Sequence, residues 1–364
     1  MSSIDIVTKH LIKQSPRVMQ IQGMMDYSSE KTEHHVKIKN VDFKFDWGVG
    51  LIVGASGSGK TTIAKNIFGD SIFNYVWGDE ALVDEFPKNI SIKKITSSLT
   101  KVGLGSVPSW LRPYSTLSNG EKFRANMAMA LVSDNDLIVI DEFTSVVDRT
   151  VAKIASNSVQ KGFRESNKKL IAVSCHYDIL EWLQPDWVID LQDFTFRRRL
   201  RRDRPKLNIE IRDGTKKDWE SLKHHHYMSG KIHPAAQMFS AFHDNRLMGF
   251  SSYIHFPHSK VKNIKMGHRA VIIPDYQGLG LGILMDDYIG EMLYKKGFRY
   301  RNRTSHPAMI KSYQKSKKWI VSSWGSTSSQ TRKSTIHKSK NQKLKRIDLS
   351  RRVTASFEYR SLNA

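Results

Sequence analysis

The sequence contains a single cysteine, Cys175, among its 364 residues. One thiol cannot form a disulfide within the chain or a zinc site built from several cysteines, so both are excluded. No run of 18 apolar residues occurs, which predicts no membrane-spanning helix. Residues 1–17 lack the apolar core of a secretory signal. We therefore expect a cytoplasmic protein with no membrane partner.

Acidic residues are scarce in only one half of the chain. The sequence has 58 Lys and Arg and 35 Asp and Glu, and 22 of each kind lie in residues 1–190, which leaves 36 basic and 13 acidic residues in 191–364. The whole net charge of +23 therefore belongs to the second half. This asymmetry predicts a domain boundary near residue 191 and a polyanionic partner, with general solubility as the alternative.

Strands and helices alternate along the first half. Leu137 to Asp141 is an unbroken apolar run that ends in an acid, as expected for a strand buried on both faces of a parallel sheet. Residues 49–53, 170–174 and 187–191 have the same character. Phe123, Met127, Ala130 and Leu131 recur with helical spacing between two of these runs. The pattern predicts an α/β fold with a parallel sheet.

A glycine-rich loop follows the first of these strands. It reads G-A-S-G-S-G-K-T, the phosphate-binding loop, and the predicted nucleotide contacts are Gly54, Ala55, Ser56, Gly57, Ser58, Gly59, Lys60, Thr61 and Thr62. Its backbone N–H groups can surround phosphate oxygens. The Thr61 hydroxyl and Asp141 are predicted to bind Mg²⁺, and Glu142 is predicted to polarise the attacking water.

A further motif, L-S-N-G-E at residues 117–121, opens a helix and offers its N-terminus to an anion. Together these motifs resemble the ATP-binding-cassette ATPase family over residues 35–191. The resemblance implies that Ser118 and Gly120 bind the nucleotide of a second subunit, that Asp148 lies in the family's D-loop, and that His176 contacts the γ-phosphate. It also implies ATP, Mg²⁺ and a homodimer that encloses ATP.

One element of that family is missing. Residues 63–116 contain no glutamine, so the loop that couples transporter cassettes to membrane domains has no counterpart, which argues against transport. Phe43, Phe45 and Trp47 are all candidates for stacking on adenine, and the sequence does not choose among them.

A second glycine loop reads Q-G-L-G-L-G. A dinucleotide-binding loop requires G-x-G-x-x-G and an acid after the next strand, and both are absent. The loop instead resembles that of the Gcn5-related N-acetyltransferase (GNAT) family. This resemblance implies acetyl-CoA, with a pyrophosphate cradle made of Gln277, Gly278, Leu279, Gly280, Leu281 and Gly282. Ile272 and Ile273 would meet the pantetheine arm and Tyr313 would protonate the leaving thiolate, while His268, Asp275 and His306 stay open as bases.

Basic residues accompany this second loop. Arg299, Arg301 and Arg303 alternate along a predicted strand at 298–304, and a Lys-rich segment occupies 322–350, which together predict contacts with DNA or RNA. The run from His224 to Tyr227 has a faint resemblance to the phage DNA-modification protein Mom. Three adjacent histidines are too closely spaced for one metal site, so a loop cluster is the favoured interpretation.

The predicted fold class is α/β and α+β: an ABC-type P-loop ATPase domain at 1–195, a basic linker at 196–206 and a GNAT-like mixed-sheet domain at 207–364. The predicted function is a soluble ATP-hydrolysing ABC enzyme coupled to acetyl-CoA-dependent N-acetyl transfer, with nucleic acid as the expected acceptor. Three alternatives remain open: a nucleic-acid clamp or remodelling ATPase with a non-catalytic GNAT fold, a DNA-base modification enzyme, and an ATP-gated protein acetyltransferase.

Overall fold

The computed structural model describes residues 2–26, 31–198, 207–226, 230–259, 261–327 and 352–361. Contacts divide the chain into two compact units. One unit is Met1–Val76 with Met129–Pro205, and the other is Trp77–Ala128 with Lys206–Ala364. Residues 77–128 therefore pack with the second half of the chain. The domain boundaries at 195 and 207 remain predictions.

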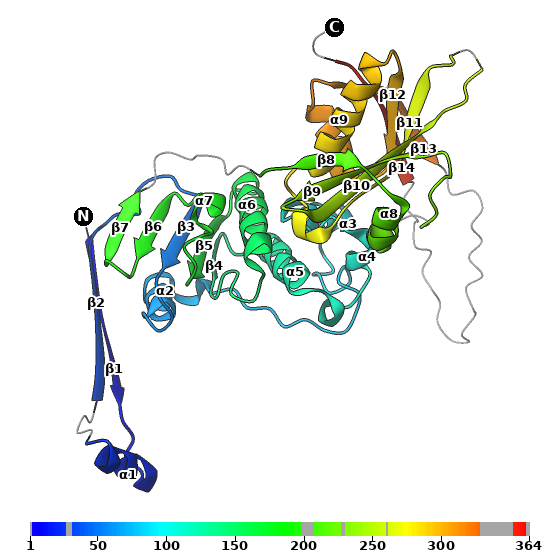
Figure 1. The fold of residues 1–364 in the computed structure, drawn as a ribbon. Coiled ribbons are helices and arrows are strands. Elements are labelled where there is room, and N and C mark those ends of the chain that lie inside the picture. The colour runs from blue at the N-terminus through cyan, green and yellow to red at the C-terminus, as the bar shows by residue number, and fades with distance from the viewer. Residues whose placement is uncertain are drawn as a thin grey trace, which may run out of the picture. The chain divides into compact units, whose positions relative to one another are not determined.

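The first unit is built on a five-stranded sheet (Figure 1). Its strands, in spatial order, are β4 (Leu137–Ile140), β5 (Lys169–Ser174), β3 (Val49–Val53), β6 (Trp187–Asp190) and β7 (Thr195–Arg198). All neighbours are parallel except β6 and β7. The apolar runs are buried as strands, which confirms the predicted parallel sheet. Ile52, Val139, Ile171 and Trp187 belong to its core.

Helices and a long two-stranded ribbon complete this unit. The helices are α2 (Lys60–Phe68), α6 (Arg149–Glu165) and α7 (Leu180–Leu183), with a 3₁₀ turn at Gly69–Ser71. The ribbon pairs β1 (Ser2–Leu11) with β2 (Lys31–Val41), and α1 (Pro16–Met24) lies between these strands in sequence. Val36, Ile38 and Val41 at the end of β2 are buried in the same core as the sheet.

The first residues of the predicted linker at 196–206 form regular structure. Residues 196–198 are part of β7, which pairs antiparallel with β6. Phe196 packs edge-on against Phe43 at 5.4 Å and joins the core cluster, so apolar burial extends the sheet into the basic stretch. Residues 199–206 lie outside the described part of the chain.

The second unit contains a seven-stranded mixed sheet. Its strands, in spatial order, are β13 (Trp319–Thr327), β14 (Arg352–Tyr359), β12 (Arg299–Thr304), β11 (Ile264–Ile272), β10 (Arg246–His255), β9 (Gln237–His243) and β8 (Glu210–Asp213). Only β11 and β12 are parallel neighbours. They pair only where Ile264–Met266 faces Arg299–Arg301, so the rest of β11 is not paired to β12.

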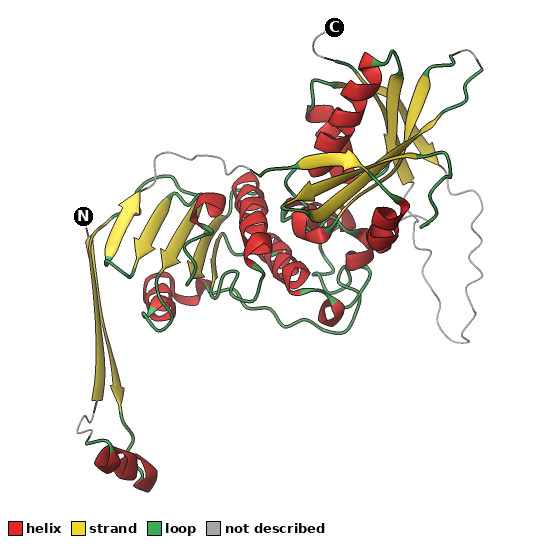
Figure 2. Cartoon of the chain, viewed as in Figure 1, coloured by secondary structure: helices red, strands yellow, loops and turns green. Residues whose placement is uncertain are grey.

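The helices of this unit are α3 (Ile92–Lys101), α4 (Val107–Trp110), α5 (Asn119–Val132), α8 (Lys216–Leu222), α9 (Leu281–Lys295) and α10 (Pro307–Lys315), with 3₁₀ turns at Tyr114–Thr116, Lys223–His225 and Pro274–Tyr276. α8, α9 and α10 pack on this sheet (Figure 2), and the unit has further helices between residues 77 and 128, the last of which continues into the first unit. α9 packs on β10, β11 and β12, and α10 packs on α3. The predicted combination of α/β and α+β architecture is confirmed. Within the described residues, no helix combines the length and apolarity needed to cross a membrane.

The predicted Lys-rich segment at 322–350 also changes at its start. Residues 322–327 continue β13, which pairs antiparallel with β14. Sequence periodicity missed this strand because Ser and Thr occupy many of its positions. The remainder of the predicted segment, 328–350, lies outside the described residues.

Candidate functional site

The phosphate-binding loop lies between β3 and α2. Gly57 and Gly59 have φ values of +78° and +88°, a left-handed conformation that glycine adopts without strain. α2 begins directly after Gly59, so the loop leads into a helix N-terminus with free N–H groups. The Lys60 ammonium donates to the Ala55 carbonyl at 2.6 Å, across the loop. This arrangement suits a phosphate chain.

Thr61 and Asp141 meet at the ends of α2 and β4. The Thr61 hydroxyl donates to Asp141 Oδ2 at 2.8 Å, so the two predicted Mg²⁺ ligands are adjacent. A hydroxyl and a carboxylate are the oxygen donors that Mg²⁺ prefers, and the residues present fit the ion. Glu142 follows with φ +53° and an exposed side chain, whose Oε2 accepts from Ser145 Oγ at 2.5 Å.

Asp148 and His176 lie on neighbouring connections of this unit. Asp148 caps α6, because its carboxylate accepts from Thr150 N at 3.0 Å and Val151 N at 3.3 Å. His176 follows β5, and its backbone N–H donates to Ser174 Oγ at 3.1 Å. Its half-buried ring is available at the carboxyl end of the parallel strands, where α/β proteins bind ligands.

The three candidate aromatics for adenine differ in their surroundings. Phe43 packs against Trp187 with ring centroids 5.0 Å apart, and Trp47 packs against the same ring at 5.4 Å. Both are therefore occupied in the core. The half-buried Phe45 ring also packs against this core, and the Arg198 guanidinium lies over it at 4.1 Å, so the structure does not choose among the three.

The L-S-N-G-E motif at residues 117–121, called the signature motif below, lies at the start of α5. Ser118 N donates to Glu121 Oε2 at 2.9 Å and Glu121 N donates to Ser118 Oγ at 3.3 Å, which is a reciprocal helix cap. Burial alone would raise the pKa of Glu121, but hydrogen bonds from Ser109 and Ser118 and the Arg112 charge hold it below its usual value. This cap fixes Ser118 and the adjoining Gly120 at a helix N-terminus.

The second glycine loop lies between β11 and α9. Gly278 and Gly280 have φ values of +85° and +82°, and Gly280 is the N-cap of α9. A Cβ on Gly282 would lie 3.0 Å from Met309 Sδ on α10, so glycine permits close helix packing there. As in the first loop, backbone N–H groups at a helix N-terminus are available to an anion.

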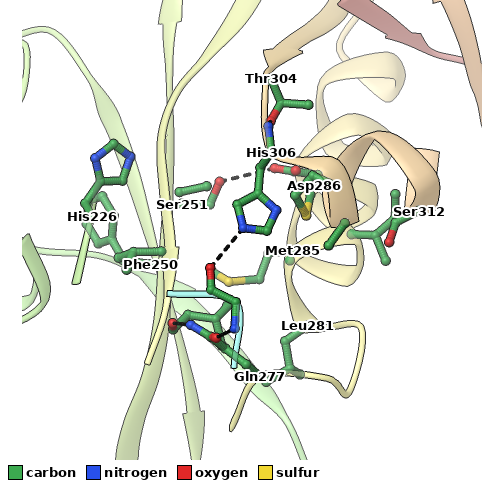
Figure 3. Close-up of a pocket in the computed structure, with 18 of the residues that line it drawn as sticks. His226, Phe250, Ser251, Gln277, Leu281, Met285, Asp286, Thr304, His306 and Ser312 are labelled. Atoms are coloured by element: carbon green, nitrogen blue, oxygen red, sulfur yellow. Dashed lines mark hydrogen bonds between the residues drawn. The ribbon is translucent and has the colours of Figure 1, made fainter. Parts of the chain in front are cut away.

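A cavity of about 410 Å³ adjoins this loop (Figure 3). Its walls come from β10, the part of β11 not paired to β12, the loop itself, α9 and α10. Residues of the segment between α3 and α4 also line it, including Gly105 and Ser106. The cavity is therefore lined by the second half of the chain and by residues that lie, in sequence, between the phosphate-binding loop and the L-S-N-G-E motif.

One residue of that segment, Gly105, contacts two sides of the cavity. Gly105 N donates to Gln277 Oε1 at 2.6 Å, and Gly105 O lies 2.9 Å from His306 Nε2. Gln277 Nε2 also donates to Ile272 O at 2.8 Å, while Ile273 N donates to Met248 O at 3.0 Å. These groups of Gln277, Ile272 and Ile273 already make hydrogen bonds within the chain. The preceding stretch of β11, which pairs with β10 but not with β12, therefore offers a ligand a more open backbone edge than they do.

Tyr313 lies at the floor of the cavity, in contact with Asp286 on α9. The Tyr313 hydroxyl donates to Asp286 Oδ2, and both side chains are buried. Ser251 Oγ, Tyr300 OH and Asn302 Nδ2 also donate to this carboxylate, at 3.3, 3.4 and 3.1 Å. Burial raises the pKa of Asp286 to about 6, although the hydrogen bonds act in the opposite direction.

Sequence reasoning missed Asp286. α9 begins with the apolar stretch L-G-I-L-M, and Asp286 follows it directly. This acid beside an apolar stretch was the available signal. A charge at the edge of an apolar helical face indicates a buried polar partner, and the partners here come from distant strands and α10.

The candidate bases have different geometries. His268 is the extra residue of a β-bulge, between the pairs Ser252–Arg269 and Tyr253–Gly267, and its Nε2 accepts from His233 N at 3.1 Å. Asp275 lies in the turn before the loop, and its carbonyl accepts from Arg124 Nη2 at 3.0 Å. His306 is the N-cap of α10 and lines the cavity.

The three predicted nucleic-acid arginines lie beside β14. Arg299 makes two hydrogen bonds to the Glu358 carboxylate, at 2.7 and 2.8 Å, and Arg301 Nε donates to the same carboxylate at 2.7 Å. Arg303 Nη2 donates to Thr354 Oγ1 at 3.3 Å. Because one acid serves two of them, the row keeps a net positive charge, but these arginines are not free side chains.

The histidine run lies in the turn after α8. His226 lines the cavity and packs edge-on against Trp219 at 5.5 Å, while burial and the neighbouring His224 lower the pKa of His225 to about 4. Tyr227 is outside the described residues. Within the described part of the chain, no group of three or more His, Cys, Asp or Glu could hold a metal.

Comparison with known proteins identifies the first motif set. A putative ABC transporter ATP-binding protein of Pyrococcus furiosus is 25% identical over 183 residues, which are 39% of this chain and 69% of that protein. A probable metal transport system ATP-binding protein of Thermotoga maritima is 31% identical over 166 residues, 38% of this chain and 68% of that protein. The chain belongs to the family of ABC ATP-binding proteins. The predicted resemblance to ATP-binding cassettes is thereby confirmed.

The ABC relationship accounts for part of the chain. The teichoic acids export ATP-binding protein TagH of Bacillus anthracis is 28% identical over 174 residues, and the match spans 41% of this ABC protein and 31% of TagH. No family model matches the chain. The chain thus spans about a third of that relative's length.

Some solved structures resemble this ABC protein at low similarity. CbiO1 of Clostridium perfringens, part of an ABC transporter complex, has a TM-score of 0.38 at 18% identity and covers 44% of this chain and 80% of its own. An acetyltransferase of Bacillus subtilis in complex with CoA has a TM-score of 0.32 at 14% identity, over 43% and 100%.

Proposed function

We propose that this ABC protein hydrolyses ATP and, in its second half, transfers an acetyl group from acetyl-CoA to an amine. The observation that carries the proposal is a pair of glycine loops, each with two left-handed glycines before a helix N-terminus, in one chain. The first loop would take the phosphates of ATP and the second the pyrophosphate of CoA.

The hydrolytic part rests on the residues around the first loop. Thr61 and Asp141 would hold Mg²⁺, which supplies charge neutralisation for the phosphates when it is bound. The Glu142 carboxylate would orient the attacking water, and His176 would contact the γ-phosphate. Because Ser118 and Gly120 would cap the nucleotide of another copy, a homodimer enclosing two ATP molecules is part of the proposal.

The transfer part rests on the cavity next to the second loop. Gly278, Gly280 and the residues around them would bind pyrophosphate through backbone N–H groups. The edge of β11 that is not paired to β12 would hold the pantetheine arm, and the thioester would reach the Tyr313–Asp286 pair. Tyr313 would give its proton to the leaving thiolate.

The acceptor class is proposed from charge. All of the net +23 lies in residues 191–364, and a nucleic acid is the acceptor or the scaffold that such a surface attracts. DNA-base modification would be one form of this activity. Arg299 and Arg301 are paired with Glu358. Other basic residues would therefore make most of the contacts with a nucleic acid.

The test is incubation of the full chain with radiolabelled acetyl-CoA, with and without ATP and Mg²⁺, in the presence of DNA, RNA or protein. Label on a nucleic acid supports the full proposal. Label on protein alone supports acetyl transfer and refutes nucleic acid as the acceptor. That outcome would favour the alternative of an ATP-gated protein acetyltransferase. CoA binding without any transfer supports a clamp or remodelling ATPase with a non-catalytic transferase fold.

A further inference from the structure

The turn after β4 has an unusual backbone. In this turn, residues 142–145, Glu142 and Thr144 have φ values of +53° and +65°. Residues with a Cβ rarely adopt this left-handed conformation, and a residue branched at Cβ, such as threonine, does so least of all. Such a backbone persists only where the surrounding structure holds it in place. The contacts that hold this turn therefore also fix where Glu142 lies.

The first of these contacts come from β5. Phe143 N donates to Val173 O at 2.8 Å, and Ser174 Oγ donates to Phe143 O at 3.1 Å. The same hydroxyl accepts from His176 N at 3.1 Å. Ser174 thus links the turn to the loop that carries His176, residues 175–178, but it contacts only the first half of the turn.

Arg149 joins the second half of the turn to the same loop. It is the first residue of α6, and its Nη1 donates to Thr144 O at 3.3 Å, where Val147 N also donates at 3.3 Å. Its other two nitrogens bind the Asp178 carboxylate, because Nε donates to Oδ2 at 3.1 Å and Nη2 donates to Oδ1. A planar guanidinium that meets a carboxylate through two bonds fixes the orientation of both groups. One side chain therefore bridges the turn, the start of α6 and the loop that carries His176.

This ion pair contributes little to the stability of the fold. The Arg149 and Asp178 side chains are 36% and 34% exposed, and ion pairs with such access to water add little to the free energy of unfolding. Burial alone would raise the pKa of Asp178, but the hydrogen bond and charge of Arg149, with the charges of Lys153 and His176, hold it below its usual value. The carboxylate is therefore ionised at neutral pH, and the main effect of the pair is on the placement of the two loops.

We propose that Arg149 is a positioning residue for ATP hydrolysis, whose guanidinium holds the turn of Glu142 and the loop of His176 in one relative orientation. This assignment rests on the proposed function, in which Glu142 orients the attacking water and His176 contacts the γ-phosphate. Arg149 acts through these two residues. Its loss leaves the phosphate-binding loop and Asp141 in place, so the effect falls on hydrolysis and not on ATP binding.

The decisive variant is Arg149→Met, which keeps a long side chain and removes its donors. We expect kcat for ATP hydrolysis, counted per ATP-binding site, to fall about tenfold or more, because small displacements of catalytic groups are costly in rate. The Kd for ATP with Mg²⁺ should change less than about threefold. A merely structural role would instead reduce the fraction of the protein that binds ATP and leave kcat per site unchanged.

Two further changes test the geometry of the contact. Asp178→Asn removes the charge that the guanidinium meets, so it should also lower kcat. The double variant Arg149→Met/Asp178→Asn should be no slower than Arg149→Met alone, because both changes break the same bridge. Arg149→Lys keeps the charge, but one ammonium cannot replace the contacts to both Thr144 O and Asp178, so it should keep less than about half of the wild-type kcat.

Lys153→Met is the matched control. Lys153 lies about one turn further along α6, is 38% exposed, and has its ammonium 3.8 Å from Asp178 Oδ2, but within the described part of the chain it has no hydrogen bond to residues 142–145. We expect its kcat to stay within about twofold of wild type.

Five results would each overturn the role of Arg149: an equal loss in Lys153→Met, an unchanged kcat in Arg149→Met, a loss confined to ATP affinity, full activity in Arg149→Lys, or additive losses in the double variant. Absence of ATP hydrolysis by the wild type would instead overturn the proposed function itself, together with this assignment.

Discussion

The Arg124 guanidinium donates to the backbone carbonyl of Asp275 at 3.0 Å, across 151 positions of sequence. Arg124 lies on α5, about one turn after the signature Gly120, and Asp275 lies two residues before Gln277 of the second loop. The side chain is fully buried, and its Nε and Nη1 have no partner among the described residues. Burial lowers the pKa of Arg124 to about 10, against the opposing charges of Asp275 and Glu121.

Arg124→Met should separate the two activities while keeping the fold. Methionine removes a buried charge whose Nε and Nη1 have no partner among the described residues, and it loses only the hydrogen bond to the Asp275 carbonyl, so we expect a melting temperature within a few degrees of wild type. If the helix transmits nucleotide binding to the second loop, ATP should alter wild-type transfer by about fivefold or more, and this response should vanish in Arg124→Met. Transfer rates with and without ATP measure it. Lys122→Met removes the same charge from a more exposed position, and an equal loss there would refute the coupling.

Glu142→Gln should stop hydrolysis and retain ATP, because the amide keeps the shape of the side chain but cannot polarise water. Size-exclusion chromatography with ATP should then show a stable dimer. Lys60→Ala should weaken nucleotide binding instead, since the loop loses its phosphate contact. Glu181→Gln, at an exposed position on α7, is the control. A monomer in the Glu142→Gln sample would contradict the nucleotide-enclosing dimer.

The cassette was predictable from sequence because its chemistry is local. Eight consecutive residues form the phosphate loop, and Asp141 ends an apolar strand, so the two motifs indicated that Thr61 and Asp141 belong to one site. Their 2.8 Å contact was therefore expected from the order of the motifs.

The cavity was not predictable in the same way. Gly105 contacts Gln277 and His306 across 172 and 201 positions, and nothing in the tripeptide around Gly105 indicates those partners. Asp286 likewise collects donors from β10, β12 and α10. Such contacts are set by how strands are ordered in the mixed sheet, and local periodicity carries no information about that order.

Asp286→Asn should change how stability depends on pH. The folded pKa of about 6 lies above the unfolded value of 3.8, so the folded state binds more protons between these values. Stability from this group is fully present below pH 3.8 and is lost as the pH rises through about 6, a difference on the order of 3 kcal/mol. Asparagine keeps an acceptor oxygen and does not ionise. Urea unfolding at pH 4 and pH 7 should therefore show a smaller loss in the variant, and an identical loss would contradict a buried ionising carboxyl.

Gly280→Glu should abolish CoA binding and spare ATP hydrolysis. Gly280 has φ +82° at the N-cap of α9, where backbone N–H groups would face the pyrophosphate, and a carboxylate there would repel phosphate. The left-handed backbone alone costs about 1 kcal/mol for a residue with a side chain, so a matched control is needed. Gly297→Glu provides it: φ is +78°, a Cβ would meet nothing within 4 Å, and the site follows the other end of α9. Isothermal titration with CoA should give no heat for Gly280→Glu and a normal isotherm for Gly297→Glu. Equal loss in both variants would trace the effect to helix destabilisation, and normal binding by Gly280→Glu would remove the second loop from the acyl-donor site.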